Sequence, residues 1–155
     1  ALSRQEGPLP RTARGPAGDR GLMHLRPAPA AGEARLQGMA YDRAALVTDA
    51  GYNIALGNGY FARMMDYFGG SYPLAVAAYN AGPGNVNKWL RANGDPRNGG
   101  VDWIDWIEAI PLSETRNYVQ RVLENAVVYE ALYPQRASYR GANPMSHFLG
   151  KRYPG

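Results

Sequence analysis

The chain has 155 residues, of which 45% are hydrophobic and 19% are charged, and this composition predicts a single globular domain with a buried core. It contains no cysteine, which excludes disulfides, thiol catalysis and cysteine-ligated metal. The net charge of +4 comes mostly from arginines in the first thirty residues, and no helical segment carries a Lys/Arg cluster. We therefore expect no nucleic-acid partner, and at most a mild attraction to an anionic polymer such as a cell wall.

No apolar run approaches the roughly 18–20 residues that a membrane-spanning helix needs. The sequence also does not open with a charged stretch followed by an apolar one, so we expect any signal peptide to be absent or already removed. The sequence predicts no transmembrane segment in this chain.

The first 40 residues are rich in Pro, Gly, Ala and Arg and show little periodicity, so we expect loop there. One short organised piece, "GLMHL", interrupts them at residues 21–25. The segment "RPAPAAGEARLQG" is included in this expected loop. The N-terminal third is therefore predicted to be irregular.

A helix is predicted from about Asp49 to Phe68, with Asp49 as its cap and Gly69-Gly70 at its end. Two glycines inside this helix, Gly57 and Gly59, suit a close approach of another backbone or a ligand. One apolar face of the helix is expected to contain Ile54, Phe61, Met64, Met65 and Phe68.

The next helix is expected to begin near Pro73, a residue suited to a first helical turn, and to end at Gly82-Pro83. Shorter helical patterns cover residues 86–92 and 103–110, and Ser113 is expected to cap the longest helix, which stops before Pro134. Residues 134–155 are polar and are expected to be irregular. The expected apolar residues of the last two helices are Trp103, Ile104, Trp106, Ile107 and Ile110, and then Tyr118, Val119, Val122, Leu123, Ala126 and Tyr129.

These segments together predict an all-α fold, because no run of alternating apolar and polar residues indicates a strand. We find no internal repeat. The organisation expected from the residues is a small bundle of short helices with polar loops at the helix ends.

Metal and serine-hydrolase chemistry find no support in the sequence. His24 and His147 lie far apart in the chain, neither is in a zinc-binding spacing, and no G-x-S-x-G motif is present. That leaves carboxylates and amides as the groups able to do chemistry. Taken singly, Glu6 is most simply a solvated surface residue, Asn80 a helix cap and Tyr118 a core tyrosine.

Taken in order, four stretches are more specific: "ALSRQE", "GPAGDRGLMH", the segment containing "AVAAYNAGPGNV", and "WIEAIPLSETRNYVQRVLENAVVY". Together they closely resemble the soluble lytic transglycosylase (SLT) domain, a family of enzymes that cleave bacterial peptidoglycan. The resemblance covers residues 1–133 and implies a lysozyme-like helical fold, with a shortened N-terminal helix before Glu6 and a polar tail over residues 134–155.

The resemblance assigns roles to individual residues. It implies that Glu6 is the catalytic carboxylate and that Met23, in the segment Gly-Leu-Met, lines the groove beside it. It implies that Tyr79-Asn80 binds substrate, with the Asn80 amide contacting an N-acetyl group. It further implies that Tyr118 hydrogen-bonds the catalytic carboxylate, and that Glu114 contacts sugar.

The reaction implied by the family cleaves the β-1,4 bond between N-acetylmuramic acid and N-acetylglucosamine and forms a 1,6-anhydromuramoyl product. A single carboxylate suffices, because the tethered C6 hydroxyl replaces the water that other glycosidases activate. No cofactor and no metal are expected. The implied partner is a peptidoglycan glycan strand, and the implied location is the bacterial cell envelope, in the periplasm. The sequence does not identify any protein partner.

The sequence departs from the family pattern near the implied catalytic residue. Gly7 stands where the family normally has Ser, and His24 stands where it normally has Gln. Two alternatives therefore stay open beside the transglycosylase: a catalytically impaired domain that binds peptidoglycan as a scaffold, and a lysozyme-type hydrolase on the same fold.

Overall fold

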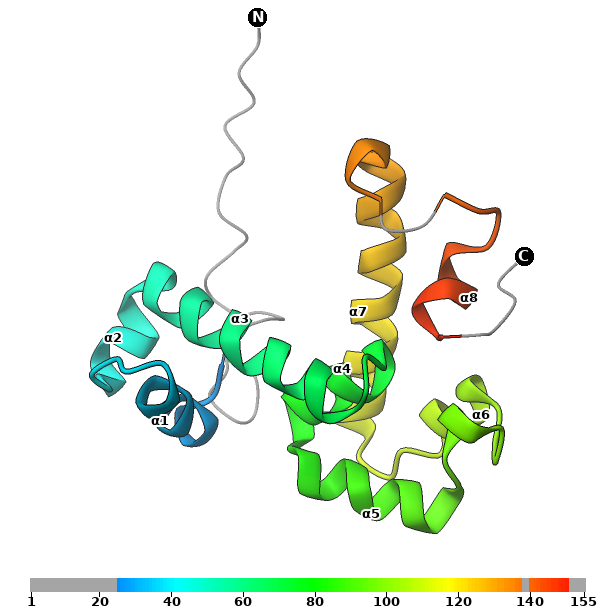
Figure 1. Cartoon of the computed structure of the whole chain (residues 1–155), viewed down its shortest axis with the longest axis horizontal. Coiled ribbons are helices and arrows are strands. Elements are labelled where there is room, and N and C mark those ends of the chain that lie inside the picture. The colour runs from blue at the N-terminus through cyan, green and yellow to red at the C-terminus, as the bar shows by residue number, and fades with distance from the viewer. Residues whose placement is uncertain (1–24, 138–139, 151–155) are drawn as a thin grey trace, which may run out of the picture. The chain divides into compact units, whose positions relative to one another are not determined.

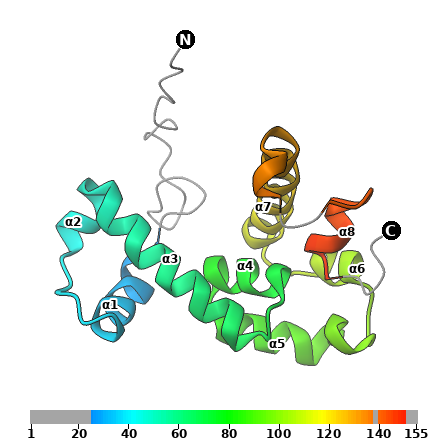
Figure 2. The same cartoon turned by 45° about the horizontal axis from the view of Figure 1, so that its top comes forward.

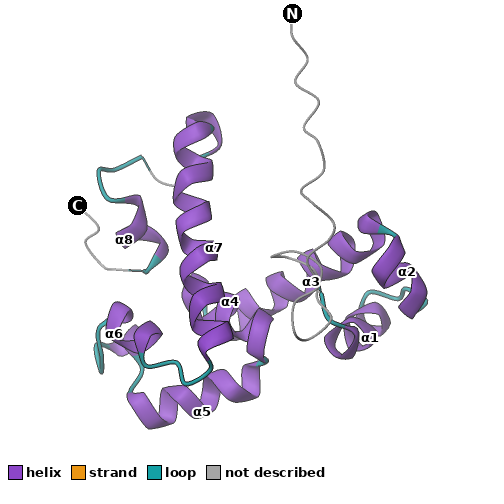
Figure 3. Cartoon of the chain, turned by 180° about the vertical axis from the view of Figure 1, so that it is seen from behind, coloured by secondary structure: helices purple, strands orange, loops and turns teal. Residues whose placement is uncertain are grey.

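A computed structural model describes residues 25–137 and 140–150 of the chain. Every regular element in the described ranges is a helix, as the sequence predicts (Figure 3). The chain divides into two compact units, residues 1–60 and 61–155, with α3 (Ala50–Tyr67) continuing from one into the other. Each unit is described separately.

The first helix, α1 (Pro27–Leu36), lies in a segment that the sequence analysis assigned to loop, so that prediction is wrong. Pro27 occupies the first helical position, where a missing N–H leaves no hydrogen bond unmade. The residues that follow are mostly alanine and other good helix formers, which sustain the helix beyond its first turn. Proline in this segment therefore starts a helix, although a Pro-rich composition is also typical of loop.

The second helix, α2 (Arg43–Thr48), begins at Asp42, whose carboxylate accepts hydrogen bonds from the backbone N–H groups of Ala44 and Ala45. An N-cap of this kind satisfies N–H groups that have no partner within the helix. The second helix thus has the local chemistry of a well-defined start.

Asn53 of α3 is a buried polar residue that links the first unit together. Its Oδ1 accepts from the N–H of Leu25 at 3.1 Å, and its Nδ2 donates to the carbonyls of Leu25 at 3.4 Å and of Leu46 at 3.0 Å. A buried amide without such partners would destabilise the fold. The side chain therefore joins the chain before α1, and the Leu46 carbonyl of α2, to one position on α3.

The predicted bounds of α3 are confirmed within a residue at each end. Asp49 accepts from the N–H of Tyr52, and Gly69 and Gly70 both adopt positive φ after the helix. The predicted apolar face is wrong at Ile54, which is 52% exposed, because the polar Asn53 takes the inward position beside it. Buried α3 residues include Asn53, Leu56 and Met64, and Phe68 directly after the helix is buried as well.

The second unit is built around α4 (Tyr72–Ala81), which is labelled in Figure 1. Its residues from Pro73 to Asn80 are all buried. Ser71 caps its start by accepting from the N–H of Leu74. The helices α5 and α7 make the most extensive contacts with it. The other elements are α5 (Pro83–Asn93), η1 (Pro96–Asn98), α6 (Trp103–Glu108), α7 (Ser113–Leu132), η2 (Pro134–Arg136) and α8 (Pro144–Phe148).

Three predictions for α6 and α7 are wrong in detail. Ser113 does not cap α7, because Leu112 is the last residue with an extended backbone and Ser113 is already the first helical residue. Ile104 and Tyr129 are 46% exposed each, so neither belongs to the core. The buried face of α7 instead contains Thr115, Tyr118, Val119, Val122 and Leu123.

The C-terminal segment is less irregular than the sequence analysis predicted. It contains η2 and the short helix α8, which begins with Pro144 at its first position. The helix lies beside α7 in the second unit (Figure 2). Leu149, directly after α8, is buried, so this part of the segment packs against the rest of the unit.

Two glycines inside helices form a matched pair for testing the packing of the first unit. A Cβ at Gly59 of α3 would lie too close to the side-chain ends of Gln37 and Glu33, which hydrogen-bond each other at 2.7 Å. A Cβ at Gly32 of α1 would meet nothing within 4 Å. Glu33 is 2% exposed, so its carboxylate depends on the partner that a larger residue 59 would displace.

We predict that Gly32→Ala raises the free energy of unfolding by about 1 kcal/mol, because alanine is the better helix former. We expect Gly59→Ala to lower it by about 1 kcal/mol, because disturbing a hydrogen bond to a buried carboxylate costs more than the helix gains. Urea denaturation of the two variants measures both effects. Equal stabilisation by the two substitutions would contradict the close approach at Gly59.

Candidate functional site at the junction of α4 and α7

The candidate site lies at the C-terminal end of α4. That helix ends at Gly82, which has φ 89° and ψ 150°, a conformation open to glycine alone. The N–H of Gly82 donates to the carbonyl of Ala78 at 2.7 Å, and Pro83 directly begins α5. The chain thus turns at one residue, and Asn80 stands in the last turn before it.

Asn80 is held by Thr115 of α7. The Thr115 hydroxyl donates to Asn80 Oδ1 at 2.7 Å, and the two residues are 2% and 9% exposed. Because the amide oxygen is engaged, the amide N–H groups of Asn80 are left as donors, and they have no acceptor within the described parts of the chain. This bond fixes the orientation of the side chain without using the group that could bind a ligand.

Tyr79 precedes Asn80 on α4, Tyr118 lies on α7, and both are 6% exposed. The Tyr79 ring packs edge-on against Phe61, with ring centroids 6.2 Å apart. Tyr118 follows Thr115 by three residues and lies on the same buried face of α7, which packs against α4. The structure therefore brings Tyr79, Asn80 and Tyr118 to one helix junction.

Glu114 lies elsewhere on α7. It is exposed, and its helical position points it away from the buried face that contains Thr115. It lines a shallow polar hollow of about 470 Å³ together with Asn117, Gln120, Arg121 and Glu124. Asn80 does not line this hollow, so the structure does not place Glu114 beside it, and the contact of Glu114 with sugar stays a prediction.

Glu6 and Met23 lie outside the described residues. Their assignment as the catalytic carboxylate and as part of the groove therefore stays a prediction from the sequence. Among the residues that the structure describes, no group of three or more His, Asp or Glu residues is arranged to hold a metal ion. No helix in the same ranges is long and apolar enough to span a bilayer.

Sequence reasoning missed Thr115. The available signal was its spacing of three residues before Tyr118, which places both on one face of a helix. A threonine next to a glutamate at a helix start gives no indication of a partner 35 residues away in the sequence. The role of Thr115 becomes visible only when α7 is packed against α4.

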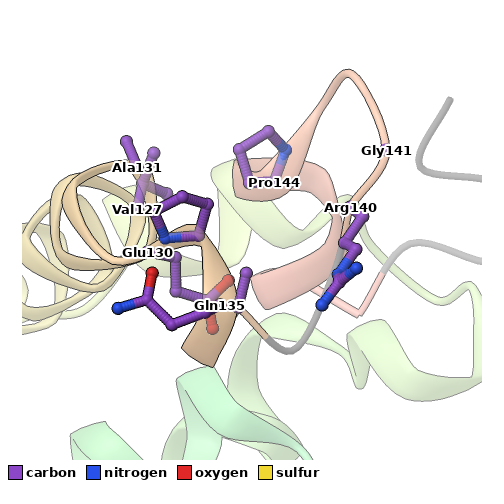
Figure 4. A pocket seen from close by; sticks show the side chains of 9 residues that line it. Val127, Glu130, Ala131, Gln135, Arg140, Gly141 and Pro144 are labelled. Carbon is purple, nitrogen blue, oxygen red and sulfur yellow. The ribbon is translucent and has the colours of Figure 1, made fainter.

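A hollow of about 570 Å³ lies between the end of α7 and the segment that leads to α8, and none of the predicted site residues lines it. Figure 4 shows Glu130 of α7 and Arg140 on opposite sides of this hollow.

Burial, and then the Glu130 carboxylate, raise the pKa of Tyr72. The Tyr72 hydroxyl is therefore protonated at neutral pH and acts as a hydrogen-bond donor.

Comparison with known proteins identifies the family of this chain. The profile of the family described as "Transglycosylase SLT domain" matches residues 1–98, and that of the "Soluble lytic transglycosylase helical domain" matches residues 109–137. These matches define a lytic transglycosylase domain. The chain belongs to the transglycosylase SLT domain family, as its motifs predict.

Individual relatives agree with this assignment. The chain is 34% identical to the soluble lytic murein transglycosylase of Escherichia coli strain K12 over 86% of its own length and 20% of that protein. It is 32% identical to the enzyme of the same description from Salmonella typhimurium, over 98% of this chain and 21% of that one. The chain thus spans about a fifth of the length of these relatives.

Solved structures are similar as well. The 70 kDa soluble lytic transglycosylase from Escherichia coli matches with a TM-score of 0.69 at 32% identity, over 91% of this chain and 22% of that one. An inactive mutant of the lytic transglycosylase Slt from Pseudomonas aeruginosa matches with a TM-score of 0.64 at 39% identity, over 79% of this chain and 19% of that one. These matches confirm the predicted all-helical fold.

The hydrogen bond between Thr115 and Asn80 can be tested by removing one hydroxyl. We predict that Thr115→Val lowers the free energy of unfolding by about 1–3 kcal/mol, because it leaves the buried Asn80 oxygen without a donor. Thr48→Val is the matched control, since the Thr48 hydroxyl is exposed and bonds only within its own helix. We expect the control to change stability by less than about 0.5 kcal/mol, as surface substitutions usually do. Equal effects of the two substitutions in chemical denaturation would show that the bond contributes nothing specific.

Proposed function

We propose that the chain cleaves the β-1,4 bond between N-acetylmuramic acid and N-acetylglucosamine in peptidoglycan and forms a 1,6-anhydromuramoyl end. The observation that carries this proposal is the preset amide of Asn80 at the junction of α4 and α7. Family membership supports peptidoglycan as the substrate. Since peptidoglycan lies in the bacterial envelope, we also propose an envelope location, in the periplasm.

In the proposed reaction Glu6 acts first as an acid and then as a base. It donates a proton to the glycosidic oxygen as the bond from C1 of N-acetylmuramic acid to that oxygen breaks. The C6 hydroxyl of the same sugar then attacks C1 and gives its proton to the Glu6 carboxylate, which restores the starting state. No water is consumed, and the intramolecular attack benefits from the high effective concentration of a tethered group.

Asn80 positions the substrate in this scheme. Its N–H groups donate to the carbonyl oxygen of an N-acetyl group, while Thr115 holds the other end of the amide. The acetyl group is thereby held where it can stabilise the positive charge that develops at C1. In support of a single essential carboxylate, the related Pseudomonas aeruginosa enzyme is inactive when one Glu is replaced by Gln.

We predict that Glu6→Gln reduces turnover of purified peptidoglycan by at least about a thousandfold while binding persists, because the amide cannot donate the proton. Product release is followed by mass spectrometry, which separates anhydro ends from reducing ends. Glu108→Gln, an exposed carboxylate of α6, is the matched control and should retain full rate.

Three results would contradict this proposal. Unchanged turnover in Glu6→Gln would reject Glu6 as the acid. Reducing ends in place of anhydro ends would show a hydrolase, and bound glycan without any product would show a binding domain.

We predict that Asn80→Asp weakens glycan binding about tenfold or more and slows turnover. Aspartate keeps an oxygen for the Thr115 hydroxyl but removes the N–H donors, so it separates ligand contact from structural support. Isothermal titration with a chitooligosaccharide measures the affinity, and thermal denaturation checks the fold. Wild-type affinity in a folded Asn80→Asp variant would show that Asn80 serves only to join α4 to α7.

A further inference from the structure

A cavity lies in the same unit at the N-terminal end of α4, opposite the end that carries Asn80. It has a volume of about 540 Å³, within the range of small-molecule sites. Tyr72 lines it and stands eight positions before Asn80 on α4, about 12 Å away along the helix axis. The cavity is therefore separate from the Asn80 site. Its side-chain walls are Met65, Tyr72, Arg97, Trp103, His147 and Phe148.

Aromatic rings from three helices form much of this cavity. The rings of Tyr72 and Phe148 meet at 5.5 Å between centroids and are tilted by 46°. Trp103 of α6 adds a third ring, which packs against the backbone at Gly150. The electron-rich faces of such rings attract the polarised C–H groups on the apolar face of a sugar ring. An aromatic wall next to polar groups is therefore suited to carbohydrate.

Arg97 supplies fixed hydrogen-bond donors at the same cavity. Its Nε lies 3.0 Å and its Nη2 2.7 Å from the two carboxylate oxygens of Asp95. This hydrogen bonding holds the pKa of Asp95 below its ordinary value, so the pair stays charged on both sides near neutral pH. The guanidinium is thereby locked in place, and its Nη1 points toward the carbonyl of Phe68 at 3.5 Å.

The charge of this pair limits what the cavity can bind. Because Asp95 offsets the charge of Arg97, this pair offers N–H donors with no net charge of its own, which suits neutral oxygen acceptors. Tyr72 also lines the cavity, and its hydroxyl is protonated at neutral pH because burial, and then the Glu130 carboxylate, raise its pKa. Hydroxyl and amide oxygens beside an apolar ring face are the groups of an N-acetylated sugar.

We propose that this cavity is a second glycan-binding site, which takes one N-acetylhexosamine unit of a strand apart from the site at Asn80. The choice of peptidoglycan as the source of that sugar rests on the proposed function, whereas the ring-and-donor chemistry does not. A strand held at both ends of α4 would stay bound after a single cleavage. The cavity would then favour long polymers over short fragments.

The test follows the indole N–H resonance of Trp103 in ¹H–¹⁵N spectra of the whole chain during titration with N-acetylchitotetraose. We expect this resonance to shift in the wild type, and to shift equally in Asn80→Asp. We expect Phe148→Leu, which keeps apolar volume but removes the ring, to raise the apparent Kd measured at Trp103 about tenfold. Tyr129→Leu removes an exposed ring of α7 that does not line the cavity, and it should leave the titration unchanged.

A static Trp103 resonance at ligand concentrations that saturate Asn80 would overturn the proposal. An unchanged Kd in Phe148→Leu would also overturn it, because the ring would then contribute nothing to binding. So would a Trp103 shift that vanishes in Asn80→Asp, because Trp103 would then report only binding at Asn80. If Phe148→Leu does not fold, Arg97→Gln is read in its place, with the same tenfold loss expected. Failure of the proposed function is distinguishable, because it shows as missing anhydro product while the Trp103 titration is unaffected.

Discussion

The packing of α4 against α5 and α7 is the constraint on which the second unit depends. A helix that is buried from Pro73 to Asn80 has no side open to water, so each side chain on it must meet a partner. Alanines at positions 75, 77 and 78 allow the neighbouring helices to come close. Asn80 is the exception to this apolar composition, and Thr115 is the partner that makes its burial tolerable.

The same constraint explains why the cavity at Tyr72 and the amide of Asn80 lie at the two ends of α4. Along its middle, α4 is covered completely and leaves no room for a ligand. At its first residue, Tyr72 faces a cavity, and near its last residue the amide of Asn80 keeps its donors. A fully buried central helix therefore confines ligand contact to its two ends, where loops and neighbouring helices diverge.

Local chemistry made much of the fold predictable. Asp49 as a cap, the pair Gly69-Gly70 and the break at Gly82 each mark a helix end through conformations or hydrogen bonds that need few other residues. The motif around Asn80 likewise identified the family before any packing was known. Such features depend on residues that are close together in the sequence, so they can be predicted without knowledge of the packing.

Packing made the remainder unpredictable. Ile54 and Ile104 fit an apolar stripe equally well by spacing, yet both are exposed, because spacing alone does not say which side of a helix meets a neighbour. Thr115 was missed because its partner is on another helix. The helix α1 was missed for a different reason, since proline in a first turn and proline in a loop look alike in sequence.

The single-residue turn at Gly82 has a consequence for how this site meets a ligand. Gly82 ends α4 and precedes the first residue of α5, so two torsion angles of one residue set the angle between the helices. No further residue separates the two helices, so the chain beside Asn80 contains no loop. The Thr115 hydroxyl already holds the amide oxygen before a ligand arrives, so little ordering entropy is lost at this side chain on association. We therefore expect any adaptation to different glycans to occur in other residues that contact the strand rather than in the side chain of Asn80.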